Sequence, residues 1–216
     1  MRIIYNYAGF KRDELFDDFS TELNYTIYGA DFDDLEAEKL PIGRCKVTII
    51  DEYDDYVSYE SDIGSNIHMA LDSVDYVEPK EAIRFWHQYK QTGVLGDPDE
   101  FEFENKGCLV SGVLAILEVI YIDKEARGNG IGSEALVDII KNFRKDFNAH
   151  FVILQPYPIE MNRYYGYDKE EKVEEGVKRL LSYYKRFGFV ATYGEFRDKK
   201  NTPIPHMVRP LKKPTV

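Results

Sequence analysis

Hydrophobic and polar positions divide the second half of the chain into apolar runs and amphipathic stretches. The run Leu109–Asp123, LVSGVLAILEVIYID, is apolar and rich in β-branched residues, which predicts a buried strand. Gly132–Phe147 has apolar residues at helical spacing, and His150–Pro156 predicts a second buried strand. Residues 170–188 predict another amphipathic helix, with Gly188 at the position of a left-handed C-terminal cap.

The remaining pattern completes one central sheet. Phe189–Phe196 and Ile204–Leu211 predict two closing strands, and Gly43–Glu60 predicts a strand followed by an acidic second strand or extended loop. Glu78–Gly93 predicts a helix, and Gly96–Glu100 a turn. The order of elements predicts an α/β or α+β fold with a central sheet flanked by helices.

Composition narrows the class of protein. The 216 residues fit one large domain or two small ones, and 44% hydrophobic residues can form a sizeable core. No apolar run reaches the roughly 18–20 residues of a membrane span, and the first residues lack a signal-peptide apolar segment. Cys45 and Cys108 form no disulfide framework, so we expect a cytoplasmic protein. The four histidines are scattered and predict no metal site.

Charge is unequally divided between the two halves. Residues 1–106 carry 25 acidic and 10 basic side chains, a balance of −15, whereas residues 107–216 carry 14 and 18, a balance of +4. The total of −11 argues against general nucleic-acid binding. The second half tolerates an anionic ligand and the first half repels one, although a solvated acidic surface explains the first half equally well.

Three glycines at alternate positions stand between the apolar run and the next helix. A glycine-rich turn that opens a helix gathers unpaired backbone N–H groups, which bind anions. A P-loop is excluded because no lysine follows the glycines. A Rossmann turn is excluded because the spacing is G-x-G-x-G and the next strand ends in LQPYP.

The segment RGNGIG, residues 127–132, matches the pattern [RQ]-x-x-G-x-[GA]. With its flanks, LEVIYIDKEARGNGIGSEAL, it resembles the GNAT superfamily of acyl-CoA-dependent N-acetyltransferases, and YYKRFGF at 183–189 resembles a second family segment. The resemblance covers about residues 108–212, within an expected single GNAT-like domain at 1–216. ALDSVDYVEPKEAIRFWHQ and LQPYPIE are similar to segments of a bacterial subset of the superfamily. The long stretch 156–171 departs from the compact family pattern.

The resemblance implies a mixed sheet whose two central parallel strands splay and hold acetyl-CoA. It implies that the pantetheine arm pairs with the first of these strands, through backbone groups of Ile120 and Ile122, and that the N–H of Ile120 stabilises an oxyanion. It further implies a turn that binds the pyrophosphate. The residues of that turn are Arg127, Gly128, Asn129, Gly130, Ile131, Gly132 and Ser133.

Two side chains are candidates for the proton transfers. Glu118 is the one charge in the run VLAILEVIYI, and a carboxylate buried there suits a general base; alternatively it is paired with a lysine or arginine, or solvated at the strand end. By two-residue periodicity it shares a strand face with Ile120 and Ile122. Tyr184 matches the family tyrosine that protonates the departing thiolate, or is a core tyrosine on its helix; Tyr183 is the neighbouring alternative.

Two functions therefore stay open. The first is an N-acetyltransferase that transfers an acetyl group from acetyl-CoA to a primary amine of a small molecule or peptide. The acidic half, residues 1–107, would form the acceptor side, which favours a cationic amine, without nucleic-acid or membrane partners. The second is a GNAT fold that binds CoA or a protein partner without catalysis. Tyrosines 164, 165 and 167 are candidates for a substrate lid, and Trp86 for the core.

Overall fold

The structure is a computed structural model. It describes residues 5–16, 20–31, 39–50, 74–76, 108–110, 112–158, 170–191 and 206–212, together with residues 70, 87 and 91. The predicted helix Glu78–Gly93, the turn Gly96–Glu100, the segment after Ile50, Trp86 and tyrosines 164, 165 and 167 lie outside these residues or almost entirely so.

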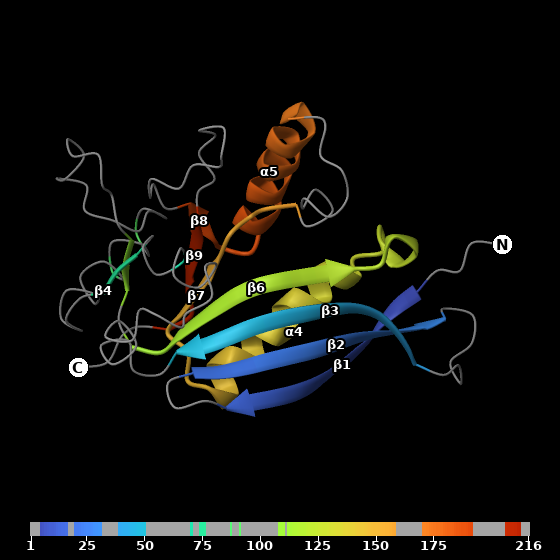
Figure 1. The fold of residues 1–216 in the computed structure, drawn as a ribbon, viewed down its shortest axis with the longest axis horizontal. Coiled ribbons are helices and arrows are strands. Elements are labelled where there is room, and N and C mark those ends of the chain that lie inside the picture. The colour runs from blue at the N-terminus through green and yellow to red at the C-terminus, as the bar shows by residue number, and fades with distance from the viewer. Residues whose placement is uncertain are drawn as a thin grey trace.

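Seven described strands form one mixed sheet in the order β1-β2-β3-β6-β7-β9-β8 (Figure 1). The strands are β1 (Tyr5–Phe16), β2 (Ser20–Asp31), β3 (Leu40–Ile50), β6 (Leu114–Ile122), β7 (Phe151–Leu154), β8 (Val190–Ala191) and β9 (Met207–Pro210). Within this sheet β6 and β7 run parallel, and the other neighbouring strands are antiparallel. A separate parallel pair joins β4 (Val74–Tyr76) to β5 (Cys108–Val110).

Three helical segments lie within the continuous described ranges: the 3-10 turn η1 (Lys124–Ala126) and the helices α4 (Ile131–Asp146) and α5 (Glu170–Lys185). Figure 1 shows α4 behind β1, β2, β3 and β6, with α5 on the side of β7. The predicted fold class, a mixed central sheet flanked by helices, is therefore confirmed.

The core lies between the sheet and α4. On β2 the buried residues alternate strictly, at Thr21, Leu23, Tyr25, Ile27 and Gly29, with partly exposed residues between them. This period of two places one face of the strand against the helix and the other toward solvent. The apolar stripe of α4 packs onto that face; its buried residues are Ile131, Ala135, Leu136, Ile139, Ile140 and Phe143.

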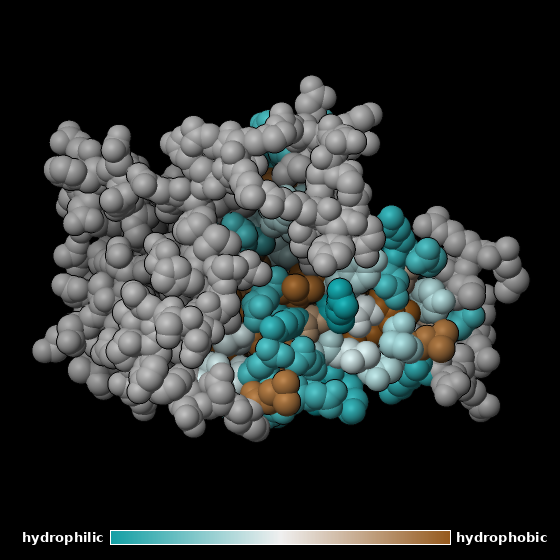
Figure 2. Space-filling view, viewed as in Figure 1, coloured by the Kyte–Doolittle hydropathy of each residue, from teal (hydrophilic) through white to brown (hydrophobic). Residues whose placement is uncertain are grey.

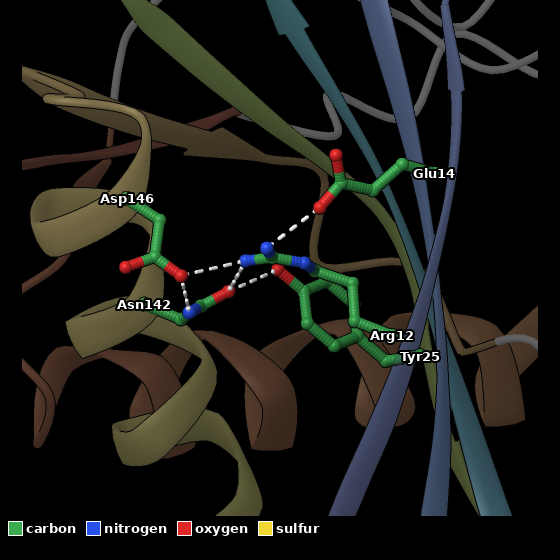
Figure 3. A network of polar contacts seen from close by, with 5 residues as sticks. All are labelled: Arg12, Glu14, Tyr25, Asn142 and Asp146. Carbon is green, nitrogen blue, oxygen red and sulfur yellow. Dashed lines mark hydrogen bonds and ion pairs between the residues drawn. The ribbon is translucent and has the colours of Figure 1, made fainter.

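A polar network joins the edge strand β1 to the last turns of α4 (Figure 3). The Arg12 guanidinium donates to Asn142 Oδ1 at 2.7 Å and to Asp146 Oδ2 at 2.8 Å, and it pairs with Glu14 at 2.6 Å. The Tyr25 hydroxyl donates to the same Asn142 oxygen at 2.9 Å. The cation therefore lies near the C-terminal end of the helix, where the helix dipole also favours positive charge.

The predicted strand Leu109–Asp123 is wrong in one respect, because it is two strands, β5 and β6. Gly112 lies between them with φ +77°, a conformation that L side chains rarely adopt. A Cβ at this position would lie 2.6 Å from His150 Nδ1. The Val113 N–H, one residue later, donates to that nitrogen at 3.1 Å. The break therefore lets the histidine ring approach the backbone.

The other predicted elements of the second half occur within a few residues of their expected bounds. The helix predicted at Gly132–Phe147 is α4, the strand at His150–Pro156 is β7, and the helix at 170–188 is α5. Gly188 has φ +79°, as its predicted role as a left-handed cap requires. The two closing strands occur as β8 and β9, and residues 192–205 of the predicted ranges lie outside the described part of the chain.

Candidate functional site

A wedge opens between β6 and β7 where their pairing ends. The two strands pair only from Leu114 with Phe151 to Leu117 with Leu154. Among the described strands, β6 from Glu118 to Ile122 therefore has a neighbour, β3, on one side only. A cavity of about 900 Å³ occupies this wedge. Its walls come from β6, the turn after η1, the start of α4, the residues after β7, and α5.

The glycine turn forms one end of the cavity. Gly128 and Gly130 line it with φ of +92° and +83°, so both positions need glycine. Gly130 is the residue before α4, and no side chain caps that helix. The first N–H groups of an α-helix have no acceptor within the helix, and the dipole makes this end positive. Because Ile131, Gly132 and Ser133 also line the cavity, it is closed at this end by a helix N-terminus.

Arg127 and Asn129 have different places in the turn. The Arg127 Nε donates to the carbonyl of Ile122 at 2.7 Å, and its guanidinium stacks 5.2 Å from the ring centre of Tyr121. Arg127 therefore fastens the turn to the end of β6 while it lines the cavity. Asn129 is outside the lining, and its amide donates to the carbonyl of Tyr5 at 3.5 Å. Of the predicted turn residues, this is the one that faces β1 instead.

Helix α5 covers the wedge with tyrosines and arginines. The Tyr183 hydroxyl lies 3.2 Å from Ser133 Oγ at the start of α4, and Arg186 stacks 5.1 Å from the Tyr183 ring centre. Arg179 and Arg186, seven residues apart, both line the cavity. Arg179 lies on α5, and Arg186 is the residue directly after the helix ends. With Arg127 they set three cations against Glu118, the one acidic residue among the described residues of the lining, which favours an anionic ligand.

Tyr184 has both of its predicted environments at once. It belongs to the core cluster, packs edge-on to Phe189 at 5.7 Å and is 7% exposed, yet it also lines the cavity. Burial raises the pKa of its hydroxyl, helped by Tyr183 and Cys45. A phenol that keeps its proton can donate it as a hydrogen bond or transfer it to a stronger base.

Glu118 lies at a β-bulge that the sequence pattern did not predict. Lys46 pairs with Val119 and Val47 with Leu117, so Glu118 is an extra residue on β6. The bulge also marks the last pair between β6 and β7. Beyond it, Ile120 opposes Cys45 on the face that packs against α4.

The extra residue places Glu118 on the face opposite to Ile120 and Ile122, so the prediction that all three share one face is wrong. Thr48 Oγ1 donates to Glu118 Oε1 at 2.7 Å, and Lys46 Nζ lies 3.6 Å from Oε2. Thr48 and Lys46 alternate with Cys45 and Val47, whose side chains belong to the core. The side chain of Glu118 is 10% exposed and lines the cavity. It is paired with a lysine, which was one of the alternatives predicted for it from the sequence.

Comparison with known proteins gives matches to solved structures only. No protein-family model matches the chain, and no curated protein matches its sequence. A protein of Klebsiella pneumoniae described as an acyl-CoA N-acyltransferase is 12% identical, with a TM-score of 0.38 over 88% of this chain and 73% of that one. A mosquito protein described as arylalkylamine N-acetyltransferase like 5b is 12% identical with a TM-score of 0.40, and the polyamine N-acetyltransferase of Drosophila melanogaster is 12% identical with a TM-score of 0.38. Each match covers 87% of this chain and 74% of the other chain.

Several residues of the site were missed in the sequence. Thr48 and Lys46 contact Glu118 from the neighbouring strand β3. No local sequence pattern reveals a cross-strand partner until the register of the two strands is known. Arg179 and Arg186 had a signal, because they stand seven residues apart within the range 170–188 that was predicted as a helix. Within the described residues, no three His, Cys, Asp or Glu side chains are grouped to hold a metal ion. No described helix combines the length and apolar character of a membrane span.

Proposed function

We propose that the chain is a GNAT-type N-acetyltransferase of the bacterial type, which transfers an acetyl group from acetyl-CoA to a primary amine. The observation that carries this proposal is the position of the glycine turn. It lies at a helix N-terminus and closes a wedge between two parallel strands that separate after four residue pairs. A phosphate-bearing ligand with a long flexible arm fits such a site, with its phosphates on the turn and its arm along β6.

The residues present fit coenzyme A. At Gly128 and Gly130 an added Cβ would meet no heavy atom within 4 Å, so each leaves open space beside the backbone. The cavity has the size of a site for a cofactor-sized ligand. Its three arginines complement phosphate groups, and the backbone of Ile120 and Ile122 supplies donors and acceptors along the arm. Arg127, Gly128, Gly130, Ile131, Gly132 and Ser133 would hold the diphosphate, with Asn129 supporting the turn.

Acetyl-CoA supplies an acetyl thioester, whose carbonyl carbon the amine nitrogen attacks and whose sulfur leaves. The chain supplies the proton transfers. An alkylammonium must lose a proton before it attacks, since its pKa is near ~10, and in this proposal Glu118 takes that proton directly or through water. Tyr184, which is buried and lines the cavity, is the proposed donor to the departing sulfur. The backbone N–H of Ile120 is the candidate donor to the carbonyl oxygen.

We infer a cationic acceptor from charge. The first half of the chain has a balance of −15, and it contributes β1, β2 and β3, the strands beside the bulge. The face of these strands that is turned away from α4 is largely hydrophilic where Figure 2 shows it. A negative surface steers protonated amines toward the site and raises their rate of association.

The test measures release of free CoA thiol from acetyl-CoA with a panel of amines. We expect turnover with polyamines, aminoglycosides or lysine-rich peptides to exceed turnover with neutral or acidic amines. The preference should weaken above about 0.15 M salt, where the Debye length is about 8 Å. A best substrate that is acidic, with kcat/KM independent of salt, would contradict the acceptor assignment and leave the transferase intact.

A second function is favoured by one observation, the prior pairing of Glu118 with Thr48 and Lys46. A carboxylate whose charge is already compensated suits a chain that binds CoA without catalysis. Calorimetry with CoA distinguishes the two functions when it is run beside the turnover assay. Binding without turnover over the whole amine panel would support this second function.

A further inference from the structure

A row of charged and polar side chains extends from the cavity across three strands. Glu118 on β6 contacts Thr48 and Lys46 on β3, and Lys46 Nζ lies 2.8 Å from Glu22 Oε2 on β2. The other oxygen of Glu22 accepts from the amide of Asn24 at 2.8 Å. These residues occupy the face of the sheet opposite to α4, so the row begins at the wedge and ends on an open sheet surface.

The contacts of Glu118 are unequal in kind. Thr48 is 3% exposed, and its 2.7 Å bond to Oε1 is a charge-assisted bond that gives the buried hydroxyl an acceptor. Lys46 is more exposed and lies between two carboxylates, at 2.8 Å and 3.6 Å. Burial lowers the pKa of Lys46, but the bond to Glu22 and the charge of Glu118 outweigh that effect and raise it. The same bond lowers the pKa of Glu22.

The bulge lies where these contacts are made. Leu117 opposes the core residue Val47, so alternation along the strand places Glu118 on the opposite face, which carries Lys46 and Thr48. The extra residue turns Ile120 and Ile122 to the core face, and Glu118 is the first residue of β6 after its pairing with β7 ends. A carboxylate at this point has one side on β3 and the other on the wedge. Each oxygen keeps further lone pairs for a water molecule or an amine.

We propose that Thr48 and Lys46 are positioning residues for Glu118, which hold its carboxylate oriented at the mouth of the wedge, while Glu22 holds Lys46. This inference rests on the proposed acetyltransferase function. It assigns Glu118 the role of a fixed anion that receives the acceptor's proton through a lone pair left by its two partners. The proton leaves the acceptor nitrogen, reaches the carboxylate directly or through one water molecule, and then passes to solvent.

Matched variants separate positioning from packing. Thr48→Val keeps the shape and removes the hydroxyl, whereas Thr48→Ser keeps the hydroxyl. Lys46→Met removes the cation, whereas Lys46→Arg keeps it. Lys141→Met is the control, because Lys141 is exposed in a surface ion pair with Asp138 on α4, outside the lining.

We expect Thr48→Val to lower kcat about 10- to 100-fold, the usual value of a bond to a charged group, with unchanged CoA affinity. Thr48→Ser should keep most of the wild-type kcat, because it keeps the hydroxyl. Lys46→Met should move the acid limb of the pH profile of kcat/KM upward, because a cation 3.6 Å from the Glu118 carboxylate is lost. Lys46→Arg and Lys141→Met should leave the profile in place.

The charged and titratable groups around Glu118 bear on this pH profile. In the described part of the chain they are Lys46 and Cys45 on β3, Glu22 on β2, Tyr121 and Arg127 near the end of β6, Arg179, Tyr183 and Tyr184 on α5, and Arg186 directly after it. Lys46→Met removes one of these groups, and the Thr48 and Lys141 variants leave all of them in place. A second residue titrating in the profile would therefore appear equally in the wild type and in the Lys141→Met control.

Three outcomes decide the proposal. Normal kcat in Thr48→Val together with an unmoved profile in Lys46→Met would overturn it. Equal losses in Thr48→Val and Thr48→Ser would also overturn it, because they indicate a packing role. If the wild type shows no turnover, the proposed function fails, and a carbon-13 NMR titration of the Glu118 carboxyl, assigned with Glu118→Gln, decides instead. A midpoint that moves upward in Lys46→Met supports positioning, and an unmoved midpoint refutes it.

Discussion

Replacing Gly130 with glutamate tests the glycine turn most directly. Gly130 precedes α4 with φ +83° and ψ −8°, lines the cavity, and has no heavy atom within 4 Å of where a Cβ would lie. A side chain there therefore extends into open space and not into protein. Its effect on ligand binding comes from bulk and charge at the helix N-terminus, apart from the strain that any non-glycine residue adds to this conformation.

The charge effect can be estimated separately. A carboxylate about 5 Å from a phosphate charge, at an effective dielectric constant of about 20, is repelled by about 3 kcal/mol. That energy corresponds to more than about 100-fold in Kd. Gly130→Gln has nearly the same bulk and strain without the charge, so the difference between the Glu and Gln variants isolates the repulsion. This difference should shrink as salt rises.

Gly9→Ala controls for backbone strain. Gly9 lies at a bulge in β1 with φ +122°, and a Cβ there would also meet nothing within 4 Å. Gly9→Ala and Gly130→Ala should each destabilise the fold by about 1–2 kcal/mol, or about 2–8 °C in Tm. Calorimetric titration with CoA should show weaker binding only for the Gly130 variants. A folded Gly130→Glu protein with wild-type CoA affinity would refute the assignment of this turn to the diphosphate.

Three further predictions concern catalysis and stability. Tyr184→Phe should lower kcat about 10²- to 10⁴-fold with unchanged CoA affinity, by the usual size of acid catalysis; a lower Tm with normal turnover would instead support a purely structural tyrosine. Arg12→Met should lower the free energy of unfolding by about 1–2 kcal/mol in urea titrations, through loss of the network in Figure 3, whereas the exposed Lys11→Met should change it by less than about 0.5 kcal/mol. Burial lowers the pKa of both His150 and His206 from 6.5 to about 4. Between these pH values the unfolded chain binds protons that the folded chain does not, so stability should fall as pH falls from 6.5 to 4. His150→Asn should make the loss of stability with falling pH shallower than in the wild type. Identical slopes for the wild type and the variant would show that His150 does not cause this loss.

The elements around the glycine turn were predictable because their signals are local. The apolar stripe of α4 repeats at helical spacing, β7 is a short apolar run, and Gly188 stands where a helix must end. The interruption at Gly112 had a weaker signal, a single glycine in an apolar run. Its reason, the approach of the His150 ring from the next strand, lies 38 residues further along the chain.

The first two strands were not predicted, although β2 alternates without error. Its outward positions include Glu22, Asn24 and Thr26, so its inward apolar residues form no continuous apolar run like those of the second half. The site was predictable where one segment supplies it, as in the turn. It was not predictable where two strands meet, because the partners of Glu118 depend on a register that includes a bulge.

The bulge also has a consequence for the length of this chain. Deleting one residue at position 118 or 119 would remove the extra residue, and the pairs on both sides of it would then follow one another in regular register with β3. Ile120 and Ile122 would keep the face that packs against α4, and the turn after them would keep its place. A one-codon deletion elsewhere in β6 would instead shift the residues between it and the bulge to the opposite face of the sheet. A scan of single-codon deletions along β6 should therefore show the smallest loss of stability at the bulge.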